Sequence, residues 1–201
     1  MRRPGNRGHS QRRPEHRAHR CARQQKLHGE ELLPVAFLEA VRGDLGASQR
    51  DLKQFAAARP WISPHYVELW GKGNQAVAAL AHADGRGALD AFASVPDFQD
   101  VSILYSRARA HQLVNDYVTA EAGYRTALKQ THNFSNFGNM RGQVPLFALL
   151  SHFYLGQLYE ATGKSQQAID EYQSFLSHFE GSRTRMPQVG EARAALKRMM
   201  H

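Results

Sequence analysis

The sequence predicts an all-α protein, an α-solenoid of about four antiparallel helix pairs with a C-terminal capping helix. From Glu30 onward, helix start and stop signals recur at short intervals, and no stretch keeps the β-branched alternation typical of strands. A fixed spacing of small and aromatic residues recurs over the same part of the chain. These observations divide the protein into a basic arm, residues 1–28, and a helical repeat domain, residues 29–201.

The arm holds the whole charge imbalance of the chain. Of the 26 basic and 18 acidic residues, nine basic residues and one acid (Glu15) lie in the arm, which gives it the full net charge of +8. The repeat domain keeps 17 of each sign and is neutral. Because the arm has almost no apolar side chains to bury, we expect it to be disordered.

Four interpretations of the arm stay open. Arginine-rich segments bind nucleic-acid phosphates without a fold, whereas a transit peptide requires an apolar face that this segment lacks. Zinc binding by His16, His19, Cys21 and His28 lacks the usual paired spacing. The patternless mixture of Arg, Pro, Gly and His also resembles translated GC-rich DNA upstream of a misplaced start codon.

Capping signals place helix boundaries in the repeat domain. Ser48 precedes "QRD", a variant of the capping box, and Ser63 precedes Pro64 at an expected first helical position. The residues expected to end or cap later helices are Pro96, Gly163 and Ser165. The apolar stretch "VPLFALLSHFYLG" is interrupted by Ser and His and is shorter than the roughly 18 residues of a membrane span, so we predict a buried helix.

The recurring spacing begins with two small residues twelve positions apart. An aromatic residue follows four positions later (Leu in the faint copy), and an apolar residue three positions after that. Clear copies are Gly156, Ala168, Tyr172, Phe175; Ala108, Ala120, Tyr124, Ala127; and Ala76, Ala88, Phe92, Val95. A fainter copy is Ala36, Ser48, Leu52, Phe55. Two helices approach closely where both present small side chains, so we expect Gly156 to face Ala168. A single hairpin cannot bury its apolar face, but stacked hairpins can.

These residues resemble the tetratricopeptide repeat (TPR). The copy at 153–176 carries most of the family signature, namely Leu155, Gly156, Tyr159, Gly163, Ala168 and Tyr172. The earlier copies depart from it at Ala79, Ala108 and His111. The first small residues of successive copies are 40, 32 and 48 positions apart, against about 34 in the family, which indicates an insertion at residues 130–145.

The end of the chain, residues 147–200, resembles the C-terminal TPR region of bacterial eukaryotic-type serine/threonine protein kinases. Similar endings occur on some bacterial transcriptional regulators and cyclases. The resemblance implies an interaction or sensory region of a signalling protein, with a protein or peptide segment as its partner. The family's groove-facing positions correspond here to Ser102, Tyr105, Arg109 and Gln112, and to Leu150, Phe153, Gln157 and Glu160. Leu150 and Phe153 serve equally well as core between repeats, and Phe134 and Phe137 of the insertion either pack or anchor a partner.

The sequence contains no catalytic constellation. The protein-kinase motifs, G-x-S-x-G and H-E-x-x-H are missing, and "WGKGNQ" lacks a preceding strand. His152 and His178 lie in apolar helical stretches, where packing explains them better than metal binding. We therefore expect a non-catalytic protein without cofactor, metal or membrane span, in the cytoplasm because its single cysteine, Cys21, cannot form an internal disulfide. A nucleic-acid-associated protein acting through the arm is the alternative, and a small-molecule sensor would require a closed apolar pocket.

Overall fold

The computed structural model describes residues 31–95, 101–131, 144–180 and 186–200. In these ranges the chain forms α-helices and no strand, which confirms the all-α prediction. The arm and almost all of the 130–145 insertion, Phe134 and Phe137 included, lie outside the described residues. The helices are α2 (Leu32–Val41), α3 (Leu45–Ala58), α4 (Pro64–Ala81), α5 (Gly85–Phe92), α6 (Val101–Leu113), α7 (Tyr117–Thr131), α8 (Val144–Ala161), α9 (Ser165–Ser177) and α10 (Pro187–Met199).

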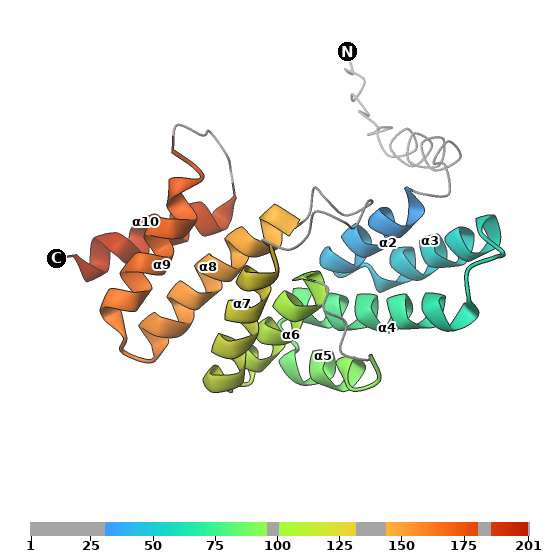
Figure 1. The fold of residues 1–201 in the computed structure, drawn as a ribbon, viewed down its shortest axis with the longest axis horizontal. Helices are drawn as coiled ribbons and strands as arrows, with labels where there is room; N and C mark the ends of the chain where they lie inside the picture. Colours follow the sequence, from blue (N-terminus) through green and yellow to red (C-terminus); the bar gives the residue numbers. More distant parts are fainter. Residues whose placement is uncertain (1–30, 96–100, 132–143, 181–185, 201) are drawn as a thin grey trace, which may run out of the picture.

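The helices pack in adjacent pairs, α2 with α3, α4 with α5, α6 with α7 and α8 with α9. A three-residue turn joins the two helices of each pair, so they run antiparallel as hairpins (Figure 1). The second helix of each pair also contacts the first helix of the next pair, and the first helices α2, α4, α6 and α8 contact one another in succession. The pairs therefore form one continuous array, which α10 ends by packing on α9.

The four turns inside the pairs share one backbone conformation. The middle residue of each turn has positive φ, 81° at Gly43, 57° at Ala83, 63° at Asn115 and 72° at Gly163. The N–H of the next residue donates to the carbonyl five positions earlier in all four turns, as in a Schellman motif. Each positive-φ residue lies seven positions after the first small residue of its copy, so the recurring spacing and the turn have the same register.

Aspartates cap the second helix of three pairs, which corrects two expectations. Asp44 and Asp84 each accept a backbone N–H at 2.8 Å, and Asp116 accepts one at 3.2 Å. A carboxylate at this place satisfies an unpaired donor and complements the positive end of the helix dipole. Ser48 is therefore not an N-cap but lies buried inside α3, and Ser165 is the first residue of α9 after its N-cap, Lys164.

The remaining boundary signals fall close to their expected places. Gly163 lies in the turn that ends α8, and Ser63 is the N-cap of α4 with Pro64 as its first residue. The Ser63 side chain makes no capping hydrogen bond, so proline alone provides the start signal. Helix α5 ends at Phe92, and Pro96 lies outside the described residues.

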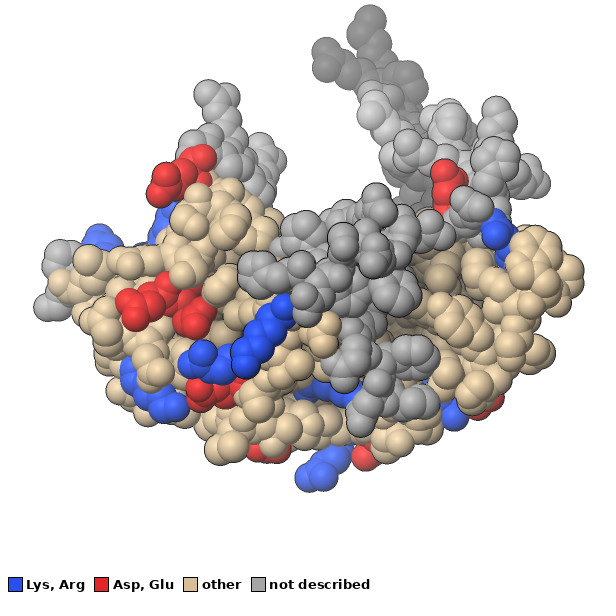
Figure 2. All heavy atoms as spheres, in the orientation of Figure 1, with Lys and Arg blue, Asp and Glu red and all other residues tan. Residues whose placement is uncertain are grey.

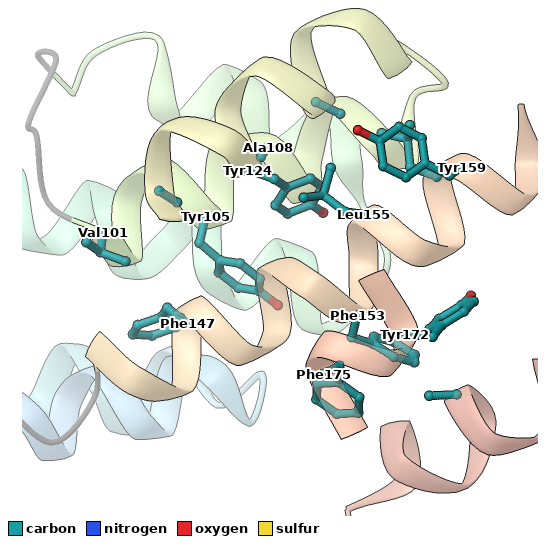
Figure 3. Close-up of a cluster of buried hydrophobic side chains, with 14 of the residues drawn as sticks. Val101, Tyr105, Ala108, Tyr124, Phe147, Phe153, Leu155, Tyr159, Tyr172 and Phe175 are labelled. Atoms are coloured by element: carbon teal, nitrogen blue, oxygen red, sulfur yellow. The ribbon is translucent and has the colours of Figure 1, made fainter. Parts of the chain in front are cut away.

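All sixteen residues of the recurring spacing are buried, including those of the faint first copy. The expected contact of Gly156 with Ala168 needs correction, because the atoms nearest to a Cβ built on Gly156 belong to the ring of Tyr172. On α6 and α7 it is Gly123 that lies against Ala108. The two helices of a pair thus come close where a small residue meets a ring, as at Tyr172, or a second small residue, as at Gly123. In both pairs the residue in contact lies about one turn beyond the one that the spacing predicts. Figure 3 shows the rings of this core between α6, α7, α8 and α9.

The array curves so strongly that its first and fourth pairs touch. The ring of Phe147, in the first turn of α8, lies 5.7 Å from the ring of Phe37 on α2 and 5.3 Å from the ring of Tyr105 on α6, centroid to centroid. All three rings are buried. Gly156 is the thirteenth residue of α8, whereas Ala108 is the eighth of α6, so α8 has an additional turn at its start that reaches α2.

Helix α10 covers the end of the array with an amphipathic face. Val189, Ala192 and Ala195 are buried against the preceding pair, while Arg193 and Lys197 are exposed. This polar outer surface is the one that an end helix of a repeat array requires. None of the described helices is both long and apolar enough to cross a membrane.

Candidate functional site

The candidate site is the surface of the first helices, where the family resemblance places a partner-binding groove. It predicts eight contact residues, four on α6 and four on α8. The structure divides them into a buried group, a half-exposed group and a group that contacts α10.

Three of the eight residues are buried and are not accessible to a partner. Ser102, Tyr105 and Phe153 have 3%, 9% and 1% of their surface exposed. The Tyr105 ring packs against Tyr124 at 6.1 Å, and the Phe153 ring packs against Phe175 at 5.4 Å. The expectation that these side chains contact a partner is therefore wrong, and for Phe153 the alternative of core packing holds. Both ring contacts lie within a single helix pair, α6 with α7 and α8 with α9.

Arg109 remains at the surface and stacks on a residue that the sequence reasoning missed. Its guanidinium carbon lies 4.3 Å from the centroid of the Tyr154 ring, and both side chains are half-buried. The Tyr154 ring lies nearly parallel to the Tyr124 ring, at 6.3 Å. The signal for Tyr154 was its place four residues after Leu150 on the same helix, which the family positions do not include. Leu150 itself is half-buried against the core.

Gln112 is held by hydrogen bonds within the protein. Its amide Nε2 donates to the carbonyl oxygen of Tyr154 at 3.2 Å, and its Oε1 accepts from the hydroxyl of Tyr124 at 2.7 Å. This amide thus joins α6 to α7 and α8. Burial raises the pKa of Tyr124 well above its ordinary value, so the hydroxyl keeps its proton for this bond. Gln112 positions the Arg109–Tyr154 stack rather than offering free polar atoms.

Gln157 and Glu160 lie at the border between α8 and α10. Gln157 donates to Glu191 at 3.4 Å, and Arg198 donates to Glu160 at 2.8 Å. The hydroxyl of Tyr172 donates to the other Glu160 oxygen at 3.1 Å. Burial and then the Glu160 charge raise the pKa of Tyr172. Of the two side chains, only Gln157 has a single long hydrogen bond at its amide nitrogen and can exchange it for a partner.

A second polar network joins α7 to α8 on another side of the array. The Tyr159 hydroxyl donates to Glu121 at 2.8 Å, and Lys164 and Arg125 form ion pairs with the same carboxylate at 3.2 Å and 3.1 Å. Burial alone would raise the pKa of Glu121, but the hydrogen bonds from Tyr159, Lys164 and Arg125 outweigh it and lower the pKa. This network stabilises the contact between neighbouring pairs.

The two singled-out histidines have local partners. His152 Nδ1 lies 2.7 Å from a Glu171 oxygen, and His178 Nδ1 lies 3.0 Å from the carbonyl oxygen of Ser174. Across the described ranges, no group of three or more His, Cys, Asp or Glu side chains is placed to hold a metal ion. Acidic and basic side chains are interspersed in small groups on the face shown in Figure 2.

Comparisons with models of protein families, with curated proteins and with solved structures found no match to this chain. The candidate site therefore rests on its own geometry. It consists of the Arg109–Tyr154 stack, half-buried Leu150 and Gln157, on the surfaces of α6 and α8 beside α10.

Proposed function

We propose that this protein is a TPR-type α-solenoid that binds a protein or peptide segment along its first helices, without catalytic activity. The observation that carries the proposal is the fourfold repetition of one helical hairpin, with the same turn in the same register in every pair. Arrays of this kind present continuous surfaces that suit extended partners.

The proposed contact surface is the Arg109–Tyr154 stack with Leu150 and Gln157. Arginine and tyrosine are enriched among residues that dominate binding energy, and here the two side chains stack on each other, with the Tyr154 ring also stacked on Tyr124. Recognition would then rely on shape, on the Tyr154 ring and on the Arg109 charge. An acidic or carbonyl-rich segment would suit this charge.

Site-specific photo-crosslinking in the source cells tests this proposal. A benzophenone amino acid at Gln157 should crosslink to a protein, and Arg109→Ala should abolish the crosslink. The same probe at Gln173, an exposed position on α9, is the matched control. Equal crosslinking from both positions, or a Gln157 crosslink that survives Arg109→Ala, would contradict the proposal.

We further propose that the chain belongs to the C-terminal region of a bacterial signalling protein, in the cytoplasm. The resemblance of residues 147–200 to the TPR region of eukaryotic-type bacterial kinases supports this assignment. An antibody against residues 146–201 tests it through the intact mass of the native protein. A mass well above 22.6 kDa is expected, and a mass of 22.6 kDa would indicate an independent protein with a natural basic arm.

A further inference from the structure

Helix α2 is apolar on all its sides, although it lies at the surface of the array. Nine of its ten residues are apolar, and Glu39 is its single charged residue. Ala36, Phe37 and Ala40 are buried on the side that packs against the rest of the array. A helix that is apolar all round is normally buried all round. The composition of α2 therefore indicates a second contact, on the side opposite to these residues.

The opposite side of α2 carries three apolar side chains, Pro34, Leu38 and Val41, which we name the α2 outer face. Their spacing of four and three residues places them on one side of the helix. Leu38 is 45% exposed, Val41 is 46% exposed and Pro34 is half-buried. In Figure 1, α2 lies along one edge of the molecule with α4 beneath it. The α2 outer face is thus accessible to another molecule.

The two ends of the array differ in polarity. At the C-terminal end, α10 exposes Arg193 and Lys197, as expected of a helix that faces water. At the N-terminal end, the α2 outer face has no charged side chain. The arm, residues 1–28, is a poor cover for this face, because it has nine basic side chains and almost no apolar ones. The same face of a second copy is apolar over the same length and does match it.

We propose that two copies of this chain associate through their α2 outer faces, with the two α2 helices antiparallel. A two-fold axis near Leu38 places this side chain against its counterpart and brings Pro34 of each copy toward Val41 of the other. A two-fold contact uses the same surface on both copies, which an apolar face without charges allows. Three side chains from each copy make a small interface, so we expect a weak dimer, with a Kd on the order of 10–100 µM.

The charges beside the α2 outer face favour the antiparallel arrangement. Glu31 and Arg42 are exposed at the two ends of the helix and lie eleven positions apart, about three turns, so they share one side of it. Arg42 pairs with Glu39 of its own helix at 3.3 Å, but its side chain remains 66% exposed and can reach a second acid. In an antiparallel pair, Glu31 of each copy lies beside Arg42 of the other.

A parallel arrangement is disfavoured by the same charges. It would place each Glu31 beside its counterpart, and each Arg42 beside its counterpart. It would also bring together the two arms, each with a charge of +8, because the arm precedes α2. In the antiparallel pair the two chains enter α2 at opposite ends, about 15 Å apart at 1.5 Å per residue. The contact is independent of the proposed peptide site, because none of its residues lies on α6, α8 or α10.

Sedimentation equilibrium of the full chain tests whether the dimer forms. The average mass should rise with protein concentration from 22.6 kDa toward the mass of a dimer. Leu38→Glu should hold the mass at 22.6 kDa at all concentrations, because it places two carboxylates at the two-fold axis. Leu38 is exposed, and circular dichroism checks that the helices persist in the variant. A wild-type monomer throughout, or a dimer that survives Leu38→Glu, would overturn the proposal.

A charge exchange tests the antiparallel arrangement. Arg42→Glu should raise the Kd of the dimer about 5-fold or more, because it replaces two attractive pairs with two repulsive ones. Adding Glu31→Arg to this variant should restore the wild-type value. The matched control is Arg193→Glu on α10, which makes the same change of net charge at an exposed position and should leave the Kd nearly unchanged. Absence of rescue, or an equal effect in the control, would overturn the proposal.

Cysteine crosslinking locates the two-fold axis. Cys21 is the only cysteine, so Cys21→Ser with Leu38→Cys leaves one thiol per chain at the expected axis. Mild oxidation should convert this variant to a disulfide-linked dimer. Cys21→Ser with Gln173→Cys, an exposed position on α9, should remain mostly monomeric under the same conditions. Equal crosslinking of the two variants would show random collision, and would overturn the proposal.

Discussion

Gly156 on α8 lies directly against the ring of Tyr172 on α9. A Cβ atom built on the glycine would be 2.7 Å from both Cδ1 and Cε1 of that ring. The ring cannot move away easily, because it is 2% exposed and its hydroxyl donates to Glu160. The spacing that repeats through the sequence thus marks, in the last pair, a position where a glycine leaves room for a ring of the facing helix.

Gly156→Ala should destabilise the protein. The added methyl overpacks the α8–α9 crossing, at a typical cost of about 1–3 kcal/mol, against a helix-propensity gain of at most about 1 kcal/mol. We expect a lower free energy of unfolding by about 1–2 kcal/mol, measured by urea denaturation. The Tyr172 ring should also shift its near-ultraviolet circular dichroism signal.

Gly190→Ala is the matched control for this substitution. Gly190 also lies inside a helix, α10, but apart from its chain neighbours and the nearby backbone of its own helix, no atom of the described residues lies within 4 Å of the position where a Cβ would be. Only the propensity term remains, so this variant should gain about 0.5–1 kcal/mol. If both variants changed stability in the same direction, the close contact at Gly156 would not limit the packing.

The aspartate caps provide a second prediction. Asp84 accepts the Gly87 N–H at 2.8 Å and caps the eight-residue α5. Asp84→Ala should lower the free energy of unfolding by about 1 kcal/mol, whereas Asp90→Ala, an exposed position on the same helix, should change it by less than about 0.5 kcal/mol. Thermal unfolding compares the two, and equal effects would contradict a capping role.

The helix pairs could be predicted from the sequence because their signal is local. The small residues and the rings repeat in one register, and the turn residue, Gly163 in the last pair, keeps the same place in it. Each of them belongs to the contact between the two helices of a single hairpin. The caps were less predictable: the pattern around Ser48 predicts a serine acceptor, whereas Asp44, four residues earlier, accepts the N–H. The shared signal was an Asp directly after the positive-φ residue in three turns.

The candidate site was less predictable because it depends on curvature. Nothing near Phe37 indicates a contact with Phe147, 110 positions later, yet this contact joins the first and fourth pairs. Tyr105 is buried against Tyr124 of its own pair and against Phe147 and Tyr154 of the next pair, while Arg109, one turn further along α6, remains at the surface. A contact between distant helix pairs has no periodic signal in the sequence. The position of a residue within its repeat therefore does not predict such a contact.

Asp51 should make the protein less stable at neutral pH than an uncharged residue would. Its carboxylate is buried, and Oδ2 has no hydrogen-bond partner among the described residues. Burial, with the charges of Glu39 and Asp44 against that of Arg50, raises the pKa of this group above its ordinary value of 3.8. A raised carboxyl pKa penalises the folded state once the group ionises, so the penalty grows as the pH rises through the folded-state value.

Asp51→Asn should therefore raise the free energy of unfolding at pH 7. Its advantage should shrink on acidification and vanish below about 3.8, where the carboxyl is protonated in both states. Urea denaturation of both proteins between neutral and acidic pH measures this difference. A constant difference across the range would show that the charge is not its cause.

Four buried tyrosines should make the fold sensitive to alkali. Burial raises the pKa of Tyr105, Tyr124, Tyr159 and Tyr172 above 10, and for Tyr159 burial and the hydrogen bond to Glu121 raise it to about 12. Below pH 10 these groups are protonated in both states, so their ionisation adds no pH dependence to the free energy of unfolding. Above pH 10 these tyrosines ionise in the unfolded chain before they ionise in the folded one, so the free energy of unfolding falls as the pH rises. For Tyr159 this fall continues to about pH 12, where the hydroxyl ionises in the folded state as well.

Tyrosinate absorbance and circular dichroism, followed together during an alkaline titration, test this expectation. The late-ionising tyrosines should appear in the absorbance together with the loss of helix, because unfolding exposes them. Tyr159→Phe should cost about 1 kcal/mol at neutral pH through its lost hydrogen bonds, and it should make the decline of stability above pH 10 less steep. If all seven tyrosines ionised before any helix was lost, the rings would be accessible in the folded state and their burial in the array would be wrong.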